Sequence, residues 1–102
     1  MSPTQRTLKH MRKNGYTCAV VERWNPYARV RQDLYGVIDV LCLGEREVVG
    51  VQATSGSNVS ARMAKIAASE HIAALRKAGV RMLVHGWRKT KGRWALREVD
   101  VS

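Results

Sequence analysis

Two apolar runs with a very short link between them constrain the fold of this chain most strongly. Residues 37–43 (VIDVLCL) and residues 47–54 (EVVGVQAT) have the length and the β-branched content of strands. Only Gly44-Glu45-Arg46 separates them. So short a link permits an antiparallel hairpin and excludes a parallel crossover.

Polar residues interrupt this apolar hairpin. Asp39 lies in the first run, and Gln52 and Thr54 lie two residues apart in the second. Side chains two apart on a strand share a face, so Gln52 and Thr54 can point together at Asp39. Burial of a carboxylate is costly unless the group is paired or binds a metal ion. The pattern therefore predicts a metal site.

The remaining chain predicts further helices and strands around this hairpin. The sequence Ser2-Pro3-Thr4-Gln5 is a typical helix start, and Gly15 is a typical helix end. We expect helices over residues 3–14 and 59–77, strands over 16–24, 80–87 and 94–101, and a polar connection over 26–35. The order α-β-β-β-α-β-β predicts one α/β domain over residues 1–102. It would contain a mixed sheet flanked by helices and a right-handed crossover through the second helix.

The charge indicates the kind of partner. The 102 residues contain 18 Lys plus Arg against 8 Asp plus Glu, a formal net charge of +10. Such a field favours polyanions, and nucleic acid is the expected partner. No apolar run reaches the length of about 20 residues that a membrane helix needs, and no signal peptide is recognisable. We therefore expect a cytoplasmic protein, no membrane association, and reduced thiols at Cys18 and Cys42.

Element order and motif together resemble the PD-(D/E)XK nuclease superfamily, whose core is α-β-β-β-α-β and which includes Holliday junction resolvases and many restriction enzymes. Residues 31–39 (RQDLYGVID) and 50–56 (GVQATSG) look most like small phage and bacterial members. The resemblance implies a restriction-endonuclease-like core and a Mg²⁺- or Mn²⁺-dependent endonuclease that hydrolyses DNA.

The resemblance also assigns roles to residues. Asp39 matches the metal-binding aspartate of the first motif. Gln52 replaces the usual acidic residue of the second motif, and Thr54 replaces its lysine. The superfamily sometimes places that lysine on the following helix, where Lys65 is the candidate. The acidic residue that the first helix often contributes has only Gln5 as its nearest match.

Other residues complete the predicted site. Asp33 and Glu22 are spare carboxylates for the metal, and Asp33 is preferred because it lies in the segment that carries the resemblance. Ser57 and Asn58 begin the second helix, whose free N–H groups can bind a phosphate. Arg62 and Lys65 share one face of that helix and can bind phosphate oxygens.

Aromatic and basic residues alternate between Trp24 and Tyr35. We expect Arg29 and Arg31 to bind nucleic acid, which suits branched or single-stranded DNA, and Trp24 to lie in the core. Trp87 and Trp94 are expected to pair across the last hairpin.

Three hypotheses follow. The chain is a Mg²⁺-dependent nuclease with Asp39, Gln52 and Lys65 as catalytic residues, or a catalytically inactive nucleic-acid-binding module on the same fold, or an interaction protein with an acidic protein partner. A nuclease of this size makes one cut per copy, so cleavage of both strands predicts a homodimer.

Overall fold

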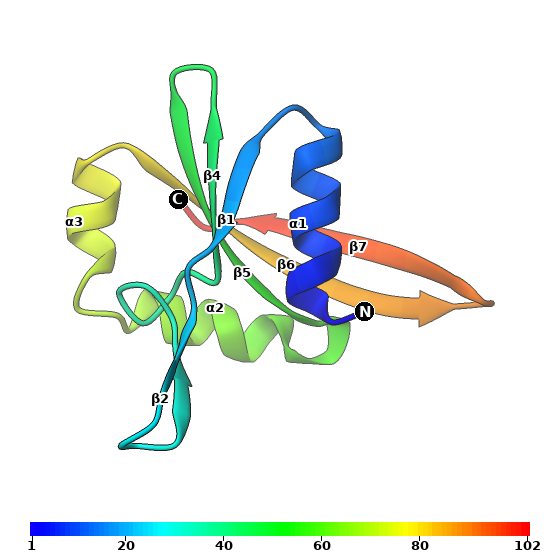
Figure 1. Cartoon of the computed structure of the whole chain (residues 1–102). Coiled ribbons are helices and arrows are strands. Elements are labelled where there is room, and N and C mark those ends of the chain that lie inside the picture. The colour runs from blue at the N-terminus through cyan, green and yellow to red at the C-terminus, as the bar shows by residue number, and fades with distance from the viewer.

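A mixed five-stranded sheet with helices on both faces organises the chain (Figure 1). The computed structural model describes residues 1–102. In chain order the elements are α1 (Pro3–Lys13), β1 (Thr17–Val20), β2 (Arg23–Asn25), β3 (Val30–Gln32), β4 (Val40–Gly44), β5 (Glu47–Ser55), the 3-10 turn η1 (Gly56–Asn58), α2 (Val59–Ala67), α3 (Ile72–Lys77), β6 (Val80–Thr90) and β7 (Arg93–Asp100). None of the helices has the length and apolarity that crossing a bilayer requires.

The strands of the main sheet run in the order β1-β4-β5-β6-β7. The pair β5–β6 is parallel and the other three pairs are antiparallel. The predicted tight hairpin is confirmed, with Gly44 opposite Glu47 and Val40 opposite Val51. The parallel pair is connected through α2 and α3, which is the expected crossover segment. The prediction of an α/β fold with a mixed sheet flanked by helices is confirmed.

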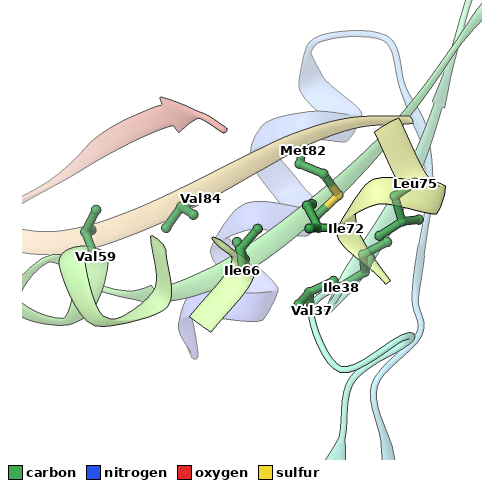
Figure 2. Packing of buried hydrophobic residues seen from close by; sticks show 8 residues of the cluster. All are labelled: Val37, Ile38, Val59, Ile66, Ile72, Leu75, Met82 and Val84. Carbon is green, nitrogen blue, oxygen red and sulfur yellow. The ribbon is translucent and has the colours of Figure 1, made fainter. Parts of the chain in front are cut away.

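Strand alternation divides the core into two clusters, one on each face of the sheet. The first cluster lies between the sheet and the helices α2 and α3 (Figure 2) and contains Val37, Ile38, Val59, Ile66, Ile72, Leu75, Met82 and Val84. The second lies under α1 and contains Leu8, Met11, Val40, Cys42, Val49, Val51 and Leu83. Each fully buried aliphatic side chain contributes about 1.5–3 kcal/mol to folding.

The first helix forms as predicted from its start and end signals. The Ser2 hydroxyl accepts a hydrogen bond of 3.2 Å from the backbone N–H of Gln5, and Pro3 occupies the first turn. The helix ends at Asn14, and Gly15 follows with φ of +92°. Its Leu8 and Met11 are buried against the sheet.

Two long predicted elements are each divided in the structure. The strand predicted over residues 16–24 leaves the main sheet after Val20, and its second part pairs with β3 as a separate two-stranded hairpin. The helix predicted over residues 59–77 is broken after Ala67. At the break the Ser69 hydroxyl accepts a hydrogen bond from the His71 N–H. Such a bond between a side chain and a nearby backbone group competes with the backbone hydrogen bonds of a helix.

Predictions for individual side chains also need correction. The sequence predicts Trp24 in the core, but 57% of its surface is exposed because β2 is not part of the main sheet. Trp87 and Trp94 do not pair directly, since Trp87 lies opposite Leu96 and Trp94 lies opposite Lys89. The turn at Lys91-Gly92 sets a register in which the partner of Trp87 lies two residues beyond Trp94.

Candidate metal centre

Asp39 lies immediately before β4 with its backbone fixed on both sides. Its N–H donates to the Val51 carbonyl and its carbonyl accepts from the Val21 N–H, each at 2.9 Å. The side chain is 4% exposed. Its Oδ2 accepts hydrogen bonds of 2.8 Å from the backbone N–H of Ala53 and from the side-chain amide of Gln52. The predicted contact between Asp39 and Gln52 is therefore present.

Gln52 connects two carboxylates. Its Nε2 donates to Asp39 Oδ2 at 2.8 Å and to Asp33 Oδ2 at 3.1 Å. The residue is fully buried, and its Oε1 has no hydrogen-bond partner. A buried acceptor without a partner costs about 1–3 kcal/mol. Rotation of the amide would present this oxygen to the two carboxylates, an arrangement that only a cation between them would favour.

Lys65 reaches the centre from α2. Its Nζ lies 3.1 Å from Asp33 Oδ2, and 45% of its side chain remains exposed. The ammonium therefore contacts both a carboxylate of the centre and the solvent in front of it. The lysine expected on the helix after the second motif does lie beside Asp33.

Glu22 is the third carboxylate. One ligand oxygen from each of Glu22, Asp33 and Asp39 lies within 4.8 Å of the other two. Glu22 Oε1 accepts a hydrogen bond of 3.4 Å from the Thr4 hydroxyl and lies 3.6 Å from Arg31 Nη1. The first helix thus contributes Thr4 to the site, while Gln5 is exposed.

The two aspartates differ in acidity. Burial is the main reason that the pKa of Asp39 rises to about 7, and the hydrogen bond with Asp33 raises it further against the donors Gln52 and Ala53. Burial alone also raises the pKa of Asp33, but hydrogen bonds from Asp39, Gln52 and Lys65 outweigh it and bring that pKa below its ordinary value. Without a cation, the pair is expected to share one proton.

The ligand set fits a hard divalent cation. Three carboxylates and one amide oxygen are the ligand types that Mg²⁺ and Mn²⁺ prefer. Gln52 turns its Nε2 toward Asp39 and Asp33, so the amide would have to rotate before its oxygen could serve as a ligand. Beside the centre lies an open cleft of about 980 Å³, whose lining includes Arg23, Arg31, Asp33, Tyr35, Lys65 and His71.

Of the other predicted site residues, only Arg31 contacts this cluster, through Glu22. Thr54 is buried and makes no hydrogen bond to Asp39. Ser57 and Asn58 form η1, where both contact the Ser55 hydroxyl, at 3.2 and 3.0 Å. Arg62 is half-buried without an ion pair. Arg29 lies in the turn of the β2–β3 hairpin, and Arg31 lies on β3.

A second polar network, which the sequence did not reveal, lies on the opposite face under α1. Thr7 Oγ1 lies 3.0 Å from His85 Nδ1 and accepts from Trp87 Nε1 at 2.9 Å, while His85 Nε2 lies 2.8 Å from Glu98 Oε2. Burial lowers the pKa of His85, partly offset by Glu98. Thr7 is fully buried, so its hydroxyl is inaccessible to a substrate. The network satisfies buried polar groups and fixes α1 on the sheet.

Comparison with known proteins does not assign the chain to a family. No protein-family model matches the sequence, and no curated protein or solved structure matches it significantly. The functional interpretation therefore depends on the residues and geometry described above.

Proposed function

We propose that the chain is a metal-dependent nuclease of the PD-(D/E)XK type that hydrolyses phosphodiester bonds in DNA. The observation that carries the proposal is the cluster of three carboxylates within 4.8 Å of one another, two of which contact the fully buried Gln52. The charge of +10 supports a polyanionic substrate.

The topology supports the same proposal. An aspartate lies immediately before β4 and a polar residue follows on β5, an order that supports a core of the superfamily's type. Gln52 stands where an acidic residue is usual, and Lys65 stands on the next helix in place of a lysine at Thr54. A restriction-endonuclease-like arrangement is part of this proposal.

Different residues of the centre would bind the metal ion and the phosphate. Asp39, Asp33, Glu22 and the Gln52 oxygen would hold a divalent cation, which supplies charge neutralisation at the phosphate and a more acidic bound water. The Lys65 ammonium faces the cleft and can bind a phosphate oxygen beside Asp33. Burial of Asp39 excludes bulk water from one side of the centre.

Cleavage assays with an isosteric substitution test this function. Asp39→Asn keeps an acceptor for the Ala53 N–H but removes the anchoring charge, so we expect Mg²⁺-dependent cleavage of DNA to fall at least about 100-fold. Glu45→Gln removes the same charge in an exposed turn and should leave cleavage unchanged. Cleavage that persists in EDTA, or in Asp39→Asn, would contradict the proposal.

A catalytically inactive nucleic-acid-binding module is the second candidate. It is favoured by the hydrogen bonds that Gln52 donates to both aspartates, since these stabilise the carboxylates without a cation. This function predicts DNA binding that is unaffected by EDTA and by Asp39→Asn, with no cleavage in Mg²⁺ or Mn²⁺. In the nuclease, cleavage of both strands of a duplex would require two copies of the chain, which sedimentation on DNA can detect.

A further inference from the structure

The β2–β3 hairpin forms an arm that extends away from the main sheet (Figure 1). We call residues 23–32 (RWNPYARVRQ) the arm; they contain three arginines and no acidic residue. Its apolar side chains are uncovered, with Trp24 57%, Tyr27 98% and Val30 47% exposed. Exposure of several large apolar side chains on one small element indicates a binding surface.

The turn of the arm is ordered. Asn25 Oδ1 accepts hydrogen bonds from the backbone N–H groups of Tyr27 and Ala28, at 3.0 and 3.2 Å. This Asx-type arrangement stabilises the turn without help from the rest of the molecule. Trp24 lies directly opposite Arg31 in the β2–β3 pairing, so the two side chains lie on one face.

The arm is joined directly to the candidate metal centre. Glu22 immediately precedes β2, and Asp33 immediately follows β3. The two residues that flank the arm therefore both contribute carboxylates to that centre. A ligand held along the arm would lie next to the cleft that Arg31, Asp33 and Lys65 line.

The charge and the side-chain types of the arm indicate which kind of ligand it binds. A second copy of the chain would bring another net charge of +10 against three arginines, which opposes self-association. A polyanion would be attracted instead. Aromatic rings next to guanidinium groups stack nucleobases, and only unpaired bases expose their faces for stacking.

We propose that the arm binds single-stranded nucleic acid, with bases stacked on Trp24 and Tyr27 and phosphates paired with the arginines. This inference rests on the proposed nuclease function in one respect, namely that it makes a strand with unpaired bases the substrate of the metal centre. It predicts that the chain prefers single-stranded or branched DNA over a continuous duplex.

Binding in EDTA tests the arm separately from catalysis. Fluorescence anisotropy would compare a labelled single strand with a duplex of the same sequence, for the native chain and for Trp24→Ala/Tyr27→Ala. The native chain should prefer the single strand, and the variant should lose at least about tenfold in affinity for it, because stacking contributes about 1–3 kcal/mol per base. Binding of the duplex should change little.

Trp94→Ala is the matched control. Trp94 is also a half-exposed tryptophan on a basic hairpin, but it stacks under the Arg6 guanidinium at 3.6 Å and lies outside the arm. The Trp94→Ala variant should bind the single strand with the affinity of the native chain. Circular dichroism would establish that all variants are folded.

The results separate the two proposals. An unchanged affinity in the arm variant, an equal loss for duplex, or a dimer that the arm substitutions dissociate would overturn the proposed role of the arm. A preserved single-strand preference with no cleavage in any metal would overturn the nuclease and leave the arm's role supported.

Discussion

Gln52→Glu is the substitution that examines the geometry of the centre most directly. The new carboxyl group would lie about 3.1 Å from Asp33 Oδ2, to which the amide now donates a hydrogen bond and whose lowered pKa keeps it ionised at pH 7. With an effective dielectric constant of about 20, two charges at that separation repel by about 5 kcal/mol. Uptake of a proton at pH 7 costs only about 3.7 kcal/mol for a group with an ordinary pKa of about 4.3. Protonation of the new carboxyl group therefore costs less free energy than leaving it ionised.

The expected loss of unfolding free energy is accordingly about 3–4 kcal/mol at pH 7 in EDTA. The pKa of the new group is raised in the folded state, so the loss grows as pH rises above about 4.3 and shrinks by about 1.4 kcal/mol for each unit that pH falls toward 5. Urea unfolding at pH 5, 6 and 7 would measure this loss of unfolding free energy and its dependence on pH. Added Mg²⁺ should recover much of the stability, because the ionised group becomes a ligand.

The control for this prediction is Gln5→Glu, the same chemical change on the exposed first turn of α1. It should cost nothing and can stabilise slightly through the helix dipole. The reasoning would be refuted by a Gln52→Glu chain that is as stable as Gln5→Glu at pH 7, or that loses the same free energy at pH 5 and pH 7.

Two further predictions concern the sheet. Burial keeps His85 neutral in the folded state while the unfolded chain takes up its proton below about pH 6.5, so the native chain should lose stability as pH falls from 7 to 5. His85→Gln should reduce this slope in thermal unfolding, and an equal reduction by His71→Gln on the surface would argue against the assignment. Gly86→Ala would drive a Cβ into the Val59 side chain and to 3.2 Å from Gly56 Cα. We expect a loss of about 1–3 kcal/mol in urea unfolding, and native stability would show that the backbones of α2 and β6 separate easily.

Local sequence signals identified the central part of the fold and of the site. The length of the link at Gly44-Glu45-Arg46 determined an antiparallel hairpin, and the two-residue period put Gln52 on the face of Asp39. Lys65 could be proposed because the superfamily that the chain resembles sometimes carries its lysine on the helix after the second motif. The first two inferences depend only on chain neighbours or on one strand pairing.

Features that depend on tertiary packing could not be predicted. The sequence favours Asp33 over Glu22 because Asp33 lies in the segment that carries the resemblance, and nothing in the sequence shows that the strand leaves the sheet after Val20. The same departure exposes Trp24, which by composition alone belongs in a core. Thr7 and His85 lie 78 positions apart, so only the docking of α1 on β6 brings them together.

The position of β5 between β4 and β6 has a consequence for the dynamics of the centre. Gln52 and Ala53 are buried opposite Val84 and His85 of β6, and the Ala53 N–H donates to the buried Asp39 carboxylate, so their hydrogen exchange should require nearly global opening. Glu22 and Asp33 lie outside the main sheet, where local fluctuations open the backbone at much lower free energy. One half of the proposed ligand set is therefore rigid, and we expect the other half to adjust its position to a bound ion.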